Sequence, residues 1–278
     1  MDLRSRIRQF ALSAGILVLA GCNTDGVSPG QVVRNADSGD KVDLRALKAG
    51  IWISTRKQQC RVWIPGDTSS SGTNAEWAGA CATRSDGTRI VSGPGSLVWT
   101  HDGRLRGIFE GRMVDGKREG DATVEYFDIS GQVAGTYKGS FHDGERHGHG
   151  VTETIRPRIA ASRYEGAFAD GLREGHGKLA LTYHVTPEGI LQRPGITYTG
   201  AFRANRPHGA GIMAFPSGDR IEGDFESGAP VGNVLYIWKN GDRFVGPTRA
   251  GKPHGEGTFT PEGGPAESAT FSDGARAG

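Results

Sequence analysis

The chain has 278 residues, with 33 lysines and arginines against 31 aspartates and glutamates, a formal net charge of +2. This near balance leaves no basic surface of the kind that binds a nucleic acid, so we expect no nucleic-acid partner. Glycine is unusually frequent, with 45 residues or about 16% against the usual ~7%. The glycines recur between aromatic residues, which indicates an internal repeat rather than a disordered chain.

Residues 1–21 are expected to be a targeting segment. Three arginines (Arg4, Arg6 and Arg8) precede an apolar stretch that ends at Ala20, which is too short to cross a bilayer, since that takes roughly 20 apolar residues. The stretch runs into LAGC, which resembles the lipobox of bacterial lipoproteins. The resemblance implies cleavage before Cys22 and acylation of its thiol and its new amino group. An ordinary signal peptide with a nearby cysteine is the alternative.

Removal of this leader takes away three arginines and one aspartate and leaves 30 charges of each sign. Residues 22–49 are then the lipidated cysteine and a tether rich in glycine, serine, aspartate and asparagine, for which we expect a flexible coil. Several acyl chains on Cys22 would give a stable membrane anchor, because one chain alone binds a bilayer only marginally.

Acylation of Cys22 would leave Cys60 and Cys81 as a pair. In an oxidising compartment we expect them to form a disulfide. A metal site is the alternative, although two cysteines with no neighbouring CxxC or CxxH make a poor ligand set. A catalytic thiol pair would need a nearby base and reducing conditions.

Residues 50–76 are expected to form an N-terminal capping hairpin, of the kind that repeat proteins need. Two short β-prone runs carry Trp52 and Trp63. A bond between Cys60 and Cys81 would join this hairpin to the first repeat.

Residues 77–264 consist of about seven copies of a glycine-rich unit. The clearest copies begin at three tyrosines and read YKGSFHDGERHGHG from Tyr137, YEGAFADGLREGHG from Tyr164 and YTGAFRANRPHGAG from Tyr198. Weaker copies begin at Trp77, Phe109, Ile221 and Phe244. The glycine two residues after each start is Gly79, Gly111, Gly139, Gly166, Gly200, Gly223 and Gly246.

Each copy is expected to form a β-hairpin. Alternate residues of a strand share a face, so Tyr137, Gly139 and Phe141 point the same way, and Asp143-Gly144 supplies the turn. Glycines within strands indicate a close approach, for which the rings of adjacent hairpins are the expected occupants. The predicted core aromatics are Trp77, Phe109, Tyr137, Phe141, Tyr164, Phe168, Tyr198, Phe202, Phe225 and Phe244.

The pattern Y-x-G-x-F-x-x-G-x-x-x-G-x-G resembles the MORN repeat (membrane occupation and recognition nexus). The resemblance implies an all-β fold, an elongated single-layer antiparallel sheet of tandem β-hairpins that serves as an interaction platform. Departures include Thr248 in place of phenylalanine and Asn205-Arg206 in place of the turn, where Asn205 is expected to replace the aspartate and the glycine is missing. Residues 265–278 are expected to be a truncated C-terminal capping half-repeat, with Ala269 in place of glycine.

Two recurring positions suggest chemistry. His147, in the run from Arg146 to Gly150 near His142, could be a metal ligand, but its repeat position also accepts glutamate, which favours a solvated residue and no metal. Glu110, Glu165 and Glu222 share another position, where an outward carboxylate row favours binding or solubility over a glycosidase pair. No metalloprotease or P-loop motif is present, and we predict no catalytic site and no cofactor.

We therefore expect a membrane-anchored, non-enzymatic lipoprotein that acts as a protein-interaction scaffold in the bacterial cell envelope. Asn23, which follows the lipidated cysteine, resembles the outer-membrane sorting choice and implies an outer-membrane location facing the periplasm. Partners would bind a concave, aromatic-lined face or the longer linkers at Phe127–Gly135, Arg156–Ser162 and His184–Gly195, where insertions mark a functional edge. The alternatives are direct binding of lipid headgroups or cell-wall glycan, and an enzyme with a site built from these linkers.

Overall fold

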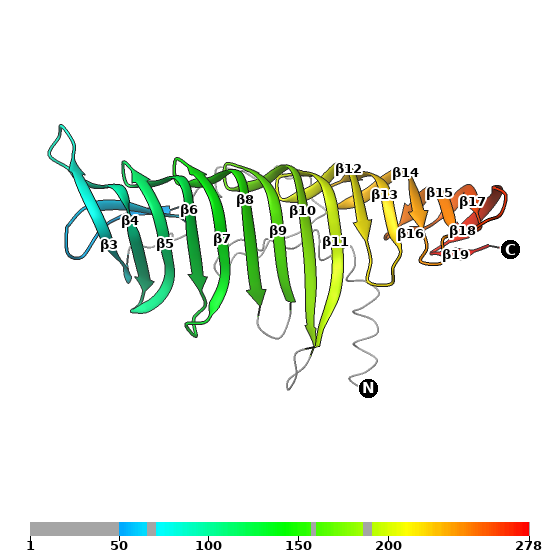
Figure 1. The fold of residues 1–278 in the computed structure, drawn as a ribbon, viewed down its shortest axis with the longest axis horizontal. Helices are drawn as coiled ribbons and strands as arrows, with labels where there is room; N and C mark the ends of the chain where they lie inside the picture. The colour runs from blue at the N-terminus through cyan, green and yellow to red at the C-terminus, as the bar shows by residue number, and fades with distance from the viewer. Residues whose placement is uncertain (1–49, 66–70, 157–159, 186–190, 278) are drawn as a thin grey trace. The chain divides into compact units, whose positions relative to one another are not determined.

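The computed structural model describes residues 50–65, 71–156, 160–185 and 191–277, and this part of the chain is all-β, with no helix. Nineteen strands form a single open sheet (Figure 1), antiparallel except for one parallel contact between Arg61 and Ile90. The all-β, antiparallel hairpin fold predicted from the sequence is confirmed. Cys22, the tether and the targeting segment lie outside the described residues.

The strand bounds are β1 Gly50–Ser54, β2 Arg61–Pro65, β3 Thr73–Thr83, β4 Arg89–His101, β5 Arg104–Val114, β6 Lys117–Phe127, β7 Val133–His142, β8 Glu145–Arg156, β9 Ala160–Ala169, β10 Leu172–Val185, β11 Leu191–Arg203, β12 Arg206–Ala214, β13 Arg220–Glu226, β14 Ala229–Ile237, β15 Arg243–Arg249, β16 Lys252–Pro253, β17 Gly255–Thr260, β18 Glu267–Ser272 and β19 Ala275–Arg276. Most strands pair with the next one along the chain, but β2 contacts β4 and β15 pairs with both β16 and β17.

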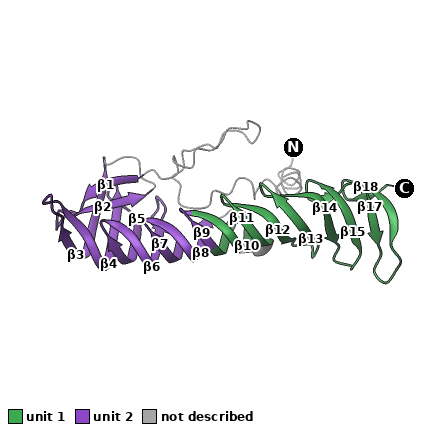
Figure 2. Cartoon of the chain, turned by 90° about the horizontal axis from the view of Figure 1, so that it is seen from above, with its two compact units in different colours: residues 1–23, 157–166, 172–278 green, residues 24–156, 167–171 purple. Residues whose placement is uncertain are grey.

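The chain divides into two compact units (Figure 2). The N-terminal unit contains the described residues up to Arg156 together with 167–171, and the C-terminal unit contains 160–166 and the described residues from Leu172 onward. In the N-terminal unit the repeat strands β3 to β8 form a meander, and β1 and β2 form a separate hairpin against it. In the C-terminal unit the meander runs from β10 to β19.

Tight two-residue turns close the hairpins from β5–β6 onward at one end, whereas residues 84–88 join β3 to β4. At Asp143-Gly144 both residues have positive φ, 49° and 90°, which is the geometry of a type I′ turn and the reason for an Asp-Gly sequence. The prediction for the hairpin at Tyr198 was wrong by one residue. There the turn residues are Ala204 and Asn205, with φ of 47° and 71°, so Asn205 replaces the glycine and not the aspartate. Asparagine tolerates this conformation better than most residues, which explains the substitution.

The two positions of each G-x-G motif require glycine for different physical reasons. Gly148 has a φ of 70° and lies where the β7–β8 register shifts, so it supplies the backbone conformation of a β-bulge. Gly150 has no such φ, pairs directly with Gly139 and leaves space for the ring of Tyr137. The bulge increases the local twist and bend of the strand, and Figure 1 shows the repeat strands as strongly curved ribbons.

The linkers at the other end of the hairpins are shorter than the sequence suggested. Strand β6 continues to Phe127 and β7 begins at Val133, so only residues 128–132 turn between them. Asp128 orders this turn, because its carboxylate accepts hydrogen bonds from the backbone N–H groups of Ser130 and Gln132. Similarly, β10 and β11 extend through most of the segment predicted to be a long linker from His184 to Gly195. The added residues lengthen strands, and residues 157–159 and 186–190 lie outside the described part.

Candidate binding surfaces

The aromatic side chains of the repeats lie in the interior of the sheet's bend. All ten of the predicted core aromatics have at most 5% of their surface exposed. Tyr137 contacts Phe141 and Phe168 edge to face, at ring-centroid distances of 5.0 and 5.5 Å, and Tyr198 contacts Phe202 and Phe225 in the same way. The prediction that these rings line a binding face is therefore wrong, because they are buried against one another.

The tyrosine rings of the clear copies cover the glycines of their own hairpin. A methyl group added to Gly150 would lie 2.6 Å from the ring of Tyr137, and one added to Gly139 would lie 2.7 Å from its hydroxyl oxygen. The tyrosine hydroxyl donates a hydrogen bond to the backbone oxygen of Ser140 at 2.8 Å. The same contact recurs between the ring of Tyr198 and Gly211. Each ring is thus fixed flat across the glycine pair of one hairpin.

Three arginines pack against these rings, a feature that the sequence analysis missed. The guanidinium of Arg118 lies 5.2 Å from the ring centre of Trp99 and 5.5 Å from those of Phe109 and Phe141. Arg146 lies over Phe168 and Arg173 over Tyr164 at similar distances. The recurring signal was visible as DGKR, DGER and DGLR, in which arginine follows the turn at one fixed position.

Arg118 is the most unusual of the three, because only 2% of it is exposed and its Nε and Nη2 atoms have no hydrogen-bond partner among the described residues. Burial lowers the pKa of its guanidinium, although an arginine keeps its charge at neutral pH. A hydrogen bond with Tyr126 and the charge of Glu145 counteract this lowering, and the ring faces add further compensation for the cation. At the corresponding position the later hairpins have Pro207, Pro230 and Pro253 and need no such compensation.

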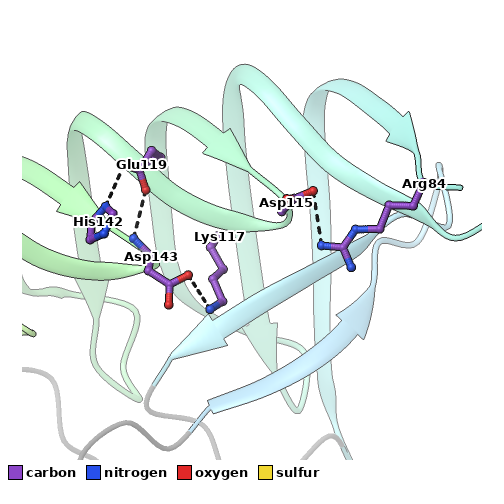
Figure 3. A network of polar contacts seen from close by, with 6 residues as sticks. All are labelled: Arg84, Asp115, Lys117, Glu119, His142 and Asp143. Carbon is purple, nitrogen blue, oxygen red and sulfur yellow. Dashed lines mark hydrogen bonds and ion pairs between the residues drawn. The ribbon is translucent and has the colours of Figure 1, made fainter.

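The edge of the sheet that carries the tight turns is held together by a polar ladder (Figure 3). Lys117 forms an ion pair of 2.6 Å with Asp143 of the next turn, and Arg84 forms one of 3.3 Å with Asp115. Backbone bonds follow the same path, since the Gly144 N–H donates to the carbonyl of Arg118. Exposed pairs of this kind contribute little singly, so the backbone bonds are the more important part.

The repeat position shared by glutamate and histidine has a structural role on this edge. The carboxylate of Glu119 accepts a hydrogen bond of 3.0 Å from the backbone N–H of Asp143, and that of Glu174 accepts one from the N–H of Ala204. His254 Nδ1 accepts the corresponding bond from the Asp273 N–H. Both residue types can accept a hydrogen bond, which explains why either is found there.

The pKa of Glu119 reflects this arrangement. Burial raises the pKa of the carboxyl, but hydrogen bonds from His142 and from the Asp143 N–H outweigh burial and bring it below its ordinary value. His142 lies 3.1 Å from Glu119, and its ring centre is 5.7 Å from that of His147. Within the described residues there is no group of three or more histidines, cysteines, aspartates or glutamates that could hold a metal ion.

The N-terminal hairpin closes the first end of the N-terminal unit. Cys60 and Cys81 form a disulfide, which confirms the predicted pairing and links this hairpin to β3. The backbone N–H of Trp63 donates to the carbonyl of Gly116, so β2 is hydrogen-bonded to the turn edge. Val62 and Ile64 of β2 are fully buried. The hairpin thus covers the turns of the first repeats and is held by a covalent bond.

The outward row of glutamates is only partly a carboxylate row. Glu165 pairs with Arg163 at 2.6 Å and Glu222 with Arg220 at 2.9 Å, each two residues earlier on the same strand, and a lysine, Lys138, occupies the position in β7. Large apolar side chains are also exposed on the C-terminal unit, including Ile212 and Val245. This outward surface is mixed in charge and partly apolar.

Comparison with protein families decides what kind of repeat this is. The model of the MORN repeat matches residues 137–153, 164–181, 198–220, 222–243 and 249–264. The chain contains MORN repeats. Their five matched segments include the three clear copies, while the copies at Trp77 and Phe109 fall outside the match. The copy at Phe109 forms a hairpin with the same two-residue turn, whereas residues 84–88 join β3 to β4 in the copy at Trp77. No curated protein matches the chain.

MORN repeats are in general repeats without catalytic activity that bind proteins or membranes. In this protein, the repeats place their rings inside and their charged ladder and outward row at the surface. As for the membrane, none of the residues described here belongs to a helix that is both long and apolar enough to span a bilayer.

Proposed function

We propose that this protein is a membrane-anchored, non-enzymatic MORN-repeat lipoprotein that acts as a protein-interaction scaffold in the bacterial cell envelope. The observation that supports a scaffold is that each repeat uses different residues for internal packing and for its exposed surface. The aromatic rings and glycines are used up in internal packing, and the surface that is left is an extended polar edge and a mixed outward face. An extended surface without deep enclosure suits a macromolecular partner.

Anchoring through Cys22 is supported by the LAGC sequence and by the disulfide. Disulfides persist in oxidising compartments and are rare in the cytosol, so the Cys60–Cys81 bond is compatible with an exported protein. We place the protein in the outer membrane facing the periplasm, because asparagine follows Cys22.

The anchor is tested by expressing the full chain and its Cys22→Ser variant in a Gram-negative host with labelled palmitate. We expect label and outer-membrane fractionation for the wild type, and neither for the variant. Labelling that persists in the variant, or a wild type found in the cytosol, would remove the anchoring part of the proposal.

The partner is tested by crosslinking the anchored full chain in cells and identifying captured proteins by mass spectrometry. We expect one envelope protein to be recovered repeatedly. Its recovery should fall when charges of the outward row are reversed, as in Glu222→Lys with Arg220→Glu, and should persist for Arg112→Met on a different strand. If well-expressed and correctly anchored protein captures no specific partner, the scaffold proposal fails.

A further inference from the structure

The last strands of the C-terminal unit line a shallow hollow of about 400 Å³ that is largely open to solvent. Its lining combines aromatic with charged side chains and consists of Asp219, Trp238, Lys239, Asn240, Asp242, Phe259, Phe271, Gly274 and Arg276. All of these residues belong to the same unit. The volume falls within the range of small-molecule sites.

The floor of the hollow is aromatic. Trp238 lies 5.5 Å from Phe271 and 5.9 Å from Phe259 between ring centres. Phe271 is buried, whereas Trp238 and Phe259 are only half-buried. By contrast, Phe244 in β15 is fully buried. The hollow therefore offers indole and phenyl surface to a ligand, unlike the interior of the repeats.

Arg276 shows why the hollow is there. It occupies the repeat position of Arg118, directly after an Asp-Gly turn. Strand β19 has two residues, so this arginine is exposed, and it lies 5.3 Å over the Phe259 ring and 2.8 Å from Glu267. In the N-terminal unit the equivalent arginine is enclosed by rings on several sides.

The rim supplies both donors and acceptors. Asp219 accepts the backbone N–H of Lys239, and Asp242 accepts that of Glu262, so both carboxylates are held in place by the backbone. Asn240 donates its amide to Asp242 at 2.8 Å. Carboxylate oxygens have about four acceptor sites and arginine has five donors, so each retains capacity for a ligand.

The charges of the rim select against an ionic ligand. Two carboxylates (Asp219 and Asp242) face two cations (Lys239 and Arg276) in the lining. A quaternary ammonium would be repelled by the Arg276 guanidinium, which already lies over the Phe259 ring, and a phosphate would be repelled by both carboxylates. A purely aliphatic ligand would leave these polar groups desolvated without partners.

We propose that this hollow binds a neutral saccharide. One face of a sugar ring carries C–H groups that pack on an indole or phenyl ring, and its hydroxyls both donate and accept hydrogen bonds. Trp238 and Phe259 provide the platform, while Asp242, Asn240 and Arg276 provide the polar contacts. This site goes beyond the scaffold function and does not depend on it.

The test uses the full chain, purified in a detergent that has no sugar headgroup. Maltotriose, cellotriose and triacetylchitotriose are titrated separately while the tryptophan indole signals are followed by NMR. We expect at least one trisaccharide to bind and to shift the Trp238 signal. In Trp238→Ala, the affinity should fall by about tenfold or more, while Ile212→Ala, an exposed change in the same unit, should leave it unaltered.

Because Trp238→Ala could disturb the packing of Phe271, the double variant Asn240→Ala/Arg276→Ala provides a second test. Both side chains are exposed, so their loss should weaken saccharide binding several-fold with the unfolding temperature unchanged. The proposal is overturned if none of the three sugars binds at 10 mM (on the order of the weakest useful affinity), or if binding survives in both variants. Preferential binding of phosphocholine or inorganic phosphate would also overturn it, in favour of an ionic ligand. The scaffold proposal would stand or fall separately, on its crosslinking result.

Discussion

The ring of Tyr137 lies so close to Gly150 that a single methyl group between them would be 2.6 Å from the ring. This contact joins the first strand of a hairpin to the second, and its counterparts recur through both units. In two hairpins the pair is different. Phe109 is matched by Ala122 and Ile221 by Val234, so a smaller or less polar first residue coincides with a larger partner.

Gly150→Ala should therefore destabilise the protein by about 1–3 kcal/mol, the usual effect of overpacking. The measurement is the free energy of unfolding in urea. Tyr137→Leu in the same background should recover part of the loss, because it removes the ring that the methyl group strikes. If the loss of unfolding free energy in the double variant equals the sum of the losses in the two single variants, the ring and the glycine do not interact.

Arg118 is a buried cation surrounded by three rings. Arg118→Met keeps most of the volume and removes the desolvated charge, so we expect the free energy of unfolding to be unchanged or raised. Arg118→Ala leaves a cavity and should lower it by about 2–4 kcal/mol. The exposed Arg112→Met in the same hairpin is the control and should have little effect. A large loss in Arg118→Met would mean that the charge itself stabilises the array.

Glu119 accepts the Asp143 N–H, and its pKa is lowered in the folded protein. A lowered pKa means that the stabilisation is present above the unfolded value, near pH 4.3, and is lost as the pH falls through the folded value. Glu119→Gln should thus lower stability at pH 7 and reduce its dependence on acid. The comparison of urea unfolding at pH 7 and pH 3 checks this, with Glu110→Gln as the exposed control. Identical acid dependence in wild type and Glu119→Gln would contradict the assignment.

The Cys60–Cys81 bond closes a sequence separation of 21 residues. Its removal in Cys60→Ser/Cys81→Ser should cost about 2–4 kcal/mol. The wild type in reductant should fall to the stability of that variant, and the variant should not respond to reductant. Hydrogen exchange of the Trp63 N–H, which is bonded to Gly116, should become faster in both. Unchanged protection would mean that hydrophobic burial alone holds the N-terminal hairpin.

The sequence by itself determined the unit of this fold. The aromatic-x-glycine triplets, the Asp-Gly turns and the alternation of faces are local features, and each depends on backbone conformations that only certain residues adopt. They were sufficient to predict tandem hairpins in chain order, whereas the pairing of Cys60 with Cys81 was predicted from the acylation expected at Cys22. They also gave the MORN resemblance that the family comparison bears out for five segments.

Only the tertiary structure decided what each repeated position contacts. The burial of Arg118, the bond from Glu119 to the next turn and the exposure of Trp238 and Arg276 all depend on the neighbouring hairpin. A periodic sequence gives the face of a residue, but the register between adjacent strands and the bend at the bulge glycines fix its partner. For that reason the rings expected at a binding face are internal, and the surface that stays exposed consists of the polar edge, the outward face and the hollow at the last strands.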